Sequence, residues 1–138
     1  MNAEISIVLE QGIEGGPSEK TEVSTEGEYN LLPDGYGVEY RETEASGMGD
    51  TVTAVGIFPE FVTLERKGDV SFFMEFKKGD HARIPYETSF GTILLDTCVR
   101  HLDKSFDDRG GRLFLDYTIN IQGELINKNK LTMNVKCV

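Results

Sequence analysis

The sequence predicts an all-β fold, a single antiparallel up-and-down barrel of about eight to ten strands. First, apolar and polar residues alternate in most segments, which is typical of strands with one buried and one solvated face. Second, turns rich in glycine and proline recur about every 8 to 12 residues, a spacing that favours sandwiches and barrels. Third, no segment requires a helix, so parallel crossovers are not expected. A meander this long twists, and it removes its exposed edges by closing on itself.

The alternation is clearest in the C-terminal third of the chain. Residues 113–121 place apolar side chains on every second position, and the same pattern resumes at residue 131 after a polar break. We expect these side chains to be mostly buried: Leu113, Leu115, Tyr117, Ile119, Ile121, Leu131, Met133 and Val135. Cys137 continues this face and is interpreted as a small core residue rather than a reactive thiol.

The remaining strands follow from the same pattern and from the turns between them. They are expected at residues 1–10, 20–30, 36–43, 51–58, 62–66, 70–76 and 82–86. Gly27 interrupts the second of these strands, and a glycine there often marks a bulge or a sharp bend. Pro85 cannot donate to a ladder, so its nitrogen should face an edge, a bulge or a gap.

Residues 91–106 fit two interpretations. Leu95, Cys98, Val99 and Leu102 could form one stripe of a helix, whereas alternate residues from Ile93 to Val99 also fit a strand. We favour a long, bent strand, because the segment is rich in threonine and valine and begins at a glycine.

Length, charge and cysteine content narrow the class of protein. The 138 residues suit one domain spanning residues 1–138, and the formal net charge of −10 argues against a nucleic-acid partner or an anionic membrane surface. No apolar run is long enough for a transmembrane helix, and the N-terminus does not resemble a secretory signal, so we expect a cytoplasmic protein. Cys98 and Cys137 fit no zinc pattern and are expected as free thiols, with no metal and no cofactor.

One set of polar residues lies on strand faces that are otherwise apolar. Tyr40 and Glu42 continue the apolar face of the strand expected at residues 36–43. Arg66 continues the apolar face of the strand at residues 62–66, and Tyr86 that of the strand at residues 82–86. If these faces point inward, Arg66 and Glu42 could simply satisfy one another near the barrel mouth. Alternatively, Arg66, Tyr40 and Tyr86 could present donors to a carboxylate or phosphate. In a third interpretation, the four side chains face water.

Several segments resemble a known family in their order and spacing. They are residues 40–43, the turn at Gly47, and residues 51–53, 66–68, 74–76 and 86–92. The chain is similar to the bacterial YwiB-like family, a domain-of-unknown-function family with a lipocalin-like (calycin) barrel. The resemblance covers nearly the whole chain. It implies the closed antiparallel barrel and no particular activity.

Three classes of function stay open at this point. The preferred hypothesis is an uncharacterised barrel that binds a small anionic or amphipathic ligand, with Arg66, Glu42, Tyr40 and Tyr86 as the ligand-binding residues. One alternative is an enzyme that acts on a small anionic substrate through Arg66, Glu42 and Tyr86. The other is a protein-interaction module whose core is solid. The ligand and the oligomeric state do not follow from the sequence.

Overall fold

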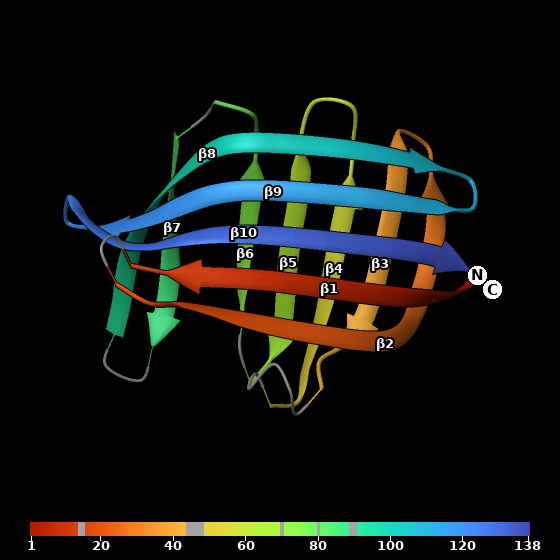
Figure 1. The fold of residues 1–138 in the computed structure, drawn as a ribbon, viewed down its shortest axis with the longest axis horizontal. Helices are drawn as coiled ribbons and strands as arrows, with labels where there is room; N and C mark the ends of the chain where they lie inside the picture. Colours follow the sequence, from red (N-terminus) through yellow and green to blue (C-terminus); the bar gives the residue numbers. More distant parts are fainter. Residues whose placement is uncertain (14–15, 44–48, 70, 80, 89–90) are drawn as a thin grey trace.

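The computed structural model describes the chain except residues 14–15, 44–48, 70, 80 and 89–90, and of residues 86–88 it describes only the backbone. The described residues form ten antiparallel strands joined by turns, so the all-β prediction is confirmed (Figure 1). They are β1 (Asn2–Gly12), β2 (Ser18–Leu32), β3 (Gly35–Arg41), β4 (Thr51–Ile57), β5 (Val62–Gly68), β6 (Phe72–Phe76), β7 (His81–Thr88), β8 (Gly91–Asp107), β9 (Gly110–Ile121) and β10 (Glu124–Cys137). The expected turn at Gly47 lies outside the described residues. No helix in the described part of the chain is long and apolar enough to cross a membrane.

The strands form one sheet that curls into a nearly closed barrel. The spatial order is β6-β5-β4-β3-β2-β1-β10-β9-β8-β7, and the first and last strands of the chain are paired from Ala3 opposite Cys137 to Gly12 opposite Lys128. In Figure 1, β1, β8, β9 and β10 run across the view, in front of β3 to β6, which run nearly perpendicular to them. Gly27 lies where β2 passes β3, and a Cβ there would collide with the carbonyl oxygen of Glu39. The register of β2 runs through Gly27 without a shift, so no bulge lies there, and the glycine instead permits the close approach of the β3 backbone.

The sheet is interrupted between β6 and β7. These strands are its two edges, and neither has a ladder partner on its outer side among the described residues. Pro85 lies in β7, so its missing amide proton falls on an edge strand, as expected. We call this boundary, where the ladder is interrupted, the β6–β7 seam.

The long C-terminal strands confirm one expectation and correct another. Residues 91–107 form the single strand β8, which carries a register shift between Val99 and His101, so the bent-strand interpretation is confirmed. Most of the polar break before residue 131 is part of a strand. Only Gln122 and Gly123 form the turn, both with positive φ, and β10 begins at Glu124. The polar stretch remains a strand because its buried amide is satisfied: Asn129 is fully buried, accepts from Gln11 at 2.9 Å and donates to Asn127 at 2.7 Å.

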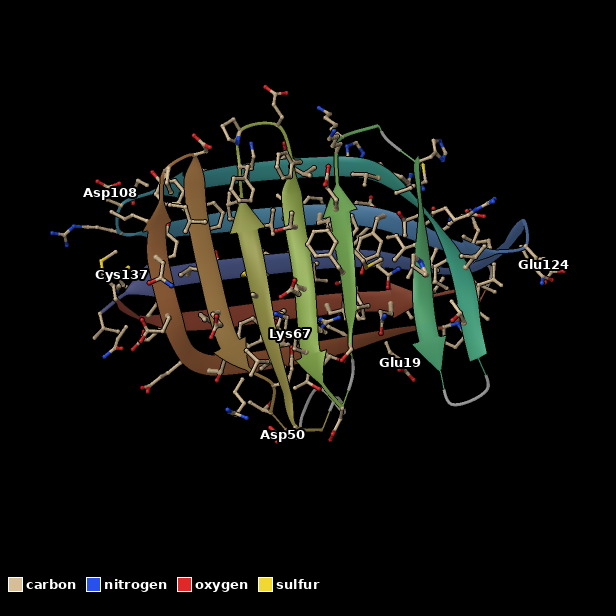
Figure 2. All side chains as sticks on the ribbon, turned by 180° about the vertical axis from the view of Figure 1, so that it is seen from behind. Glu19, Asp50, Lys67, Asp108, Glu124 and Cys137 are labelled. Carbon is tan, nitrogen blue, oxygen red and sulfur yellow. The ribbon has the colours of Figure 1, made fainter. Side chains whose placement is uncertain are left out.

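The core lies between the two crossing layers. Five of the eight residues expected there are buried, namely Leu113, Leu115, Tyr117, Met133 and Val135, whereas Ile119, Ile121 and Leu131 are partly buried. Figure 2 shows side chains filling the space between the layers, while the labelled Glu19, Asp108 and Glu124 lie at the periphery.

Aromatic rings close one end of this core. Tyr29 stacks on Tyr36 with ring centroids 5.5 Å apart, and both stack on Phe106. The Tyr29 hydroxyl donates to the carbonyl oxygen of Asp107 at 2.7 Å, which ties β2 to the end of β8. Three of the polar residues singled out by the sequence, Tyr40, Glu42 and Arg66, lie elsewhere, towards the C-terminal ends of β3 and β5.

Candidate functional site

Three neighbouring strands place polar side chains in one inward-facing row. Tyr40 of β3 is the register partner of Thr53 of β4, and Thr53 is the partner of Arg66 of β5. Glu42 directly follows β3, where its amide donates to the carbonyl oxygen of Thr51 at 2.8 Å. Because register partners point to the same side of a sheet, the four side chains converge on the interior.

Glu42 and Arg66 are linked through a hydroxyl. Thr53 Oγ1 donates to Glu42 Oε1 at 2.5 Å, and Arg66 Nε donates to the same Thr53 oxygen at 3.3 Å. Arg66 Nε and Glu42 Oε1 are 3.7 Å apart, and their side chains are 16% and 3% exposed. The prediction that both residues project into the barrel within charge-pairing reach is therefore confirmed. The sequence did not predict that the Thr53 hydroxyl would lie between the Glu42 carboxylate and the Arg66 guanidinium.

The terminal amino groups of the Arg66 guanidinium make no hydrogen bond to a described residue. Its carbon Cζ lies 5.0 Å from the ring centroid of Phe72, so the ring holds the group by a cation–π contact. Only Nε hydrogen-bonds to a described residue, and neither terminal amino group has an acceptor among those residues. A guanidinium cannot lose its charge, so these amino groups are permanent donors at the site.

The Arg66 charge acts on two buried phenols. Tyr40 is 5% exposed, and burial, followed by the Glu42 charge, raises the pKa of its phenol. Tyr117 comes from β9 in the opposite layer, is 9% exposed and packs on Phe76 with ring centroids 5.0 Å apart. Burial raises the pKa of Tyr117 as well, and the Arg66 charge opposes that rise.

Sequence reasoning assigned Tyr117 to the core and gave it no role at the site. The alternation in residues 113–121 indicated that Tyr117 faces inward, but it did not indicate which strands of the opposite layer Tyr117 lies against. Of the four predicted site residues, the structure brings together Tyr40, Glu42 and Arg66. Tyr86 lies in β7 opposite Ile93, and its side chain is outside the described part of the structure.

The raised pKa values of three buried tyrosines predict that the free energy of unfolding decreases at alkaline pH. The pKa values of Tyr29, Tyr40 and Tyr117 are raised in the folded protein, mainly by burial, whereas an unfolded phenol titrates near 10. Above about pH 10 the unfolded chain therefore binds fewer protons than the native protein, and the free energy of unfolding falls as pH rises. Urea unfolding at pH 8, 10 and 11 measures this slope, and Tyr40→Phe should make it shallower. Equal stability at all three values of pH would contradict the burial of these phenols.

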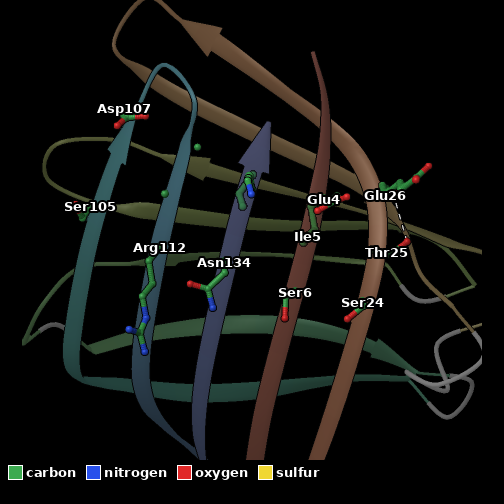
Figure 3. Close-up of a pocket in the computed structure, with 14 residues that line it drawn as sticks. Glu4, Ile5, Ser6, Ser24, Thr25, Glu26, Ser105, Asp107, Arg112 and Asn134 are labelled. Atoms are coloured by element: carbon green, nitrogen blue, oxygen red, sulfur yellow. Dashed lines mark hydrogen bonds between the residues drawn. The ribbon is translucent and has the colours of Figure 1, made fainter. Parts of the chain in front are cut away.

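A hollow lies on the outer face of the barrel. About 930 Å³ in volume, it crosses β2, β1, β10, β9 and β8, and register partners form its floor: Ser24, Ser6, Asn134, Arg112 and Ser105. Figure 3 shows these side chains on successive strands of an open surface, with Glu4 and Glu26 near one end. Arg112 is exposed here, in contrast to Arg66. The groove offers water-accessible groups rather than a desolvated site.

Metal-ligating side chains do not gather in the described residues. These contain no group of three or more His, Cys, Asp or Glu side chains that could hold an ion. Both cysteines are free thiols, and Cys98 Sγ lies 3.8 Å from His81 Nε2 on β7. The Glu42–Thr53–Arg66 cluster is therefore the site with buried, convergent polar groups, and we call it the barrel-end cluster.

Comparison with known proteins supports the fold. Residues 5–133 match the model of a family described as a domain of unknown function (DUF1934). No curated protein matches the chain. The crystal structure of the ywiB protein from Bacillus subtilis is similar, with a TM-score of 0.86 and 20% sequence identity over 99% of this chain and 92% of that one. At this identity the likeness concerns the fold alone.

Proposed function

Because the chain belongs to the DUF1934 family, a domain family of unknown function, we propose a function from the site itself. We propose that the protein binds a small molecule bearing a carboxylate or phosphate at the barrel-end cluster. Arg66 is the anchor, and binding rather than catalysis is the function.

The free end of the Arg66 guanidinium is the observation that carries this proposal. The Arg66 side chain is 16% exposed, and its terminal nitrogens are not among the buried side-chain atoms that lack a partner, so they are open to water and to an incoming acceptor. Here the contacts to Thr53 and Glu42 engage Nε, and the terminal amino groups have no acceptor among the described residues. Two parallel N–H donors of this kind match the two oxygens of a carboxylate or a phosphate.

The surrounding residues suit positioning of the anchor. Thr53 and Glu42 fix the Nε edge of the guanidinium, and Phe72 supports its face at 5.0 Å. Glu42 is 3% exposed and already accepts from Thr53, so its carboxylate is better placed to orient Arg66 than to exchange protons with a substrate. This arrangement favours a binding protein over the alternative of an enzyme that uses Glu42 as its base.

Size and access point to a compact ligand. Large side chains with less than 2% exposure fill the middle of the barrel, among them Phe76, Leu113, Leu115 and Met133. A small anion therefore suits the site better than a long amphipathic chain. Arg66 lies on β5, one strand from the β6 edge of the sheet.

Titration with sodium acetate and inorganic phosphate, followed by ¹H–¹⁵N NMR, tests the proposal. Arg66→Lys keeps the charge but loses the planar fork, and we expect it to weaken binding about tenfold, roughly 1.4 kcal/mol, with little change in stability. Arg112→Lys is the matched control, because Arg112 is an exposed arginine in the outer groove. It should leave binding unchanged. The proposal is wrong if neither anion binds, or if Arg112→Lys weakens binding as much as Arg66→Lys.

A further inference from the structure

An open pocket of about 290 Å³ lies at the aromatic end of the barrel, with walls from β8 and from the β3–β4 pair. Figure 1 shows these strands in the two crossing layers, so the pocket is shared between the layers. Ile57 lines it at the opposite end of β4 from Thr53 of the barrel-end cluster. We infer that this pocket binds an aromatic monocarboxylate, independently of the function proposed for the barrel-end cluster. We call it the interlayer pocket, and its walls include Asp34, Tyr36, Ile57, Phe58, Lys104 and Phe106.

Aromatic residues form the apolar walls of the interlayer pocket. The rings of Tyr36 and Phe106 stack with centroids 6.4 Å apart, and both pack on the fully buried ring of Tyr29. Tyr36 and Phe106 are themselves only partly buried, so they present surface to the pocket. Phe58 adds a third ring, which stacking on Phe61 at 4.8 Å holds in place. Aromatic pairs gain stability beyond the area they bury, so these walls favour an aromatic ring over an aliphatic ring of similar size.

Lys104 places a cation on a strand face that is otherwise apolar. Leu102 and Phe106, two positions away on either side, pack against the core, and the register partner Leu113 is buried. A lysine in such a position lays its stem along apolar surface and extends its ammonium group to a polar opening. Here the ammonium donates to the carbonyl oxygen of Pro59 at 2.9 Å, in the turn between β4 and β5. Lys104 therefore reaches from β8 to the opposite layer.

The Lys104 ammonium has donors available for a ligand. It carries three N–H groups, and the contact with Pro59 engages one of them. It forms no ion pair with a carboxylate of the described residues. A bound carboxylate would supply that partner. Asp34 lines the same pocket without pairing with Lys104, so its charge would repel a second negative charge on the ligand. One carboxylate therefore suits the site better than a dicarboxylate or a phosphate.

The size of the interlayer pocket limits the ligand to about one ring. Ligand pockets usually measure about 300–1,000 Å³, and apolar walls with a few convergent polar groups are typical of them. At about 290 Å³ this pocket is at the lower end of that range. Benzoate, one aromatic ring with one carboxylate, is therefore the probe that matches its volume, its walls and its cation.

Titration of the intact protein with sodium benzoate, followed by ¹H–¹⁵N NMR, tests the inference. We expect the amide signals of Tyr36, Ile57 and Phe106 to shift, with a dissociation constant of about 1 mM. Cyclohexanecarboxylate has the same charge and no aromatic ring, and it should bind about fivefold more weakly. Arg66→Lys should leave the benzoate affinity measured from these three signals unchanged.

Lys104→Met tests the role of the cation. We expect this variant to weaken benzoate binding about tenfold. Benzyl alcohol has the ring without the charge and should bind the variant and the unaltered protein within twofold of one another. This comparison separates the lost charge from a general loosening of the pocket, because loosening would weaken both compounds. Lys130→Met is the matched control, since Lys130 is an exposed lysine of β10 outside the pocket, and it should leave benzoate binding unchanged.

Several results would overturn the inference. It is wrong if benzoate shifts none of the three signals, if cyclohexanecarboxylate binds as tightly, or if Lys130→Met weakens benzoate as much as Lys104→Met does. An equal loss of benzyl alcohol and benzoate in Lys104→Met also contradicts it. If Arg66→Lys abolishes the benzoate shifts, benzoate binds at the barrel-end cluster alone, so this inference fails and the proposed function stands. Failure of acetate and phosphate to bind has the reverse meaning, because it removes the proposed function and leaves the interlayer pocket.

Discussion

Arg66→Met is expected to lower the free energy of unfolding by about 3–5 kcal/mol, the cost of leaving a buried charge unpaired. The variant removes the cation beside Glu42, whose side chain is 3% exposed and accepts a hydrogen bond from the Thr53 hydroxyl. Methionine fills much of the same space, so the loss reflects charge rather than a cavity. Urea unfolding at pH 7 measures the effect.

Two further variants make this experiment decisive. Arg66→Met combined with Glu42→Leu should recover much of the lost stability, because the stranded carboxylate is removed. Arg41→Met breaks the Arg41–Asp50 pair, whose side chains are 69% and 77% exposed, and should cost about 1 kcal/mol or less. If Arg66→Met costs no more than Arg41→Met, Glu42 is not held in the barrel by Arg66.

Leu115→Ala is expected to destabilise the protein by about 2–5 kcal/mol through lost burial and a residual cavity. Leu115 is 2% exposed on β9, with β8 on one side and β10 on the other. Ile119→Ala, in the same strand, should cost less, because Ile119 is only partly buried. Urea unfolding of the two variants compares them directly. An equal or smaller loss for Leu115→Ala would contradict the placement of the core centre.

The sequence predicted most of the fold because alternation and turn chemistry are local properties. The inward direction of Arg66 and Glu42 was predictable for the same reason, since each continues an apolar face. The Thr53 bridge was not, because it depends on the register between β4 and β5. The position of Tyr117 in the layer opposite Arg66 depends on how the whole sheet closes, which no single strand encodes.

The polar residues of β10 illustrate a second limit. A run of asparagines and lysines between residues 127 and 130 indicates a loop when each residue is considered alone. Asn129 is nevertheless fully buried, because Gln11 lies opposite it on β1 and supplies the donor that its side-chain oxygen needs. Such compensation comes from a residue more than a hundred positions away, so local composition cannot indicate it.

Because β1 pairs with β10, neighbours along the chain are also neighbours in the sheet, except that β6 and β7 lie at its two edges. The two termini lie together, with the amide of Val138 donating to the carbonyl oxygen of Asn2 at 3.1 Å, while the β6–β7 seam carries no ladder. A circular permutant that joins these termini and opens at Gly79 would keep every strand pair of the sheet. Its strands would then follow one another as neighbours from one edge to the other. In the natural order, pairing β1 with β10 brings together residues from the two ends of the chain, whereas in the permutant a short hairpin would join these strands. The permutant would therefore have a lower contact order, and a lower contact order favours faster folding.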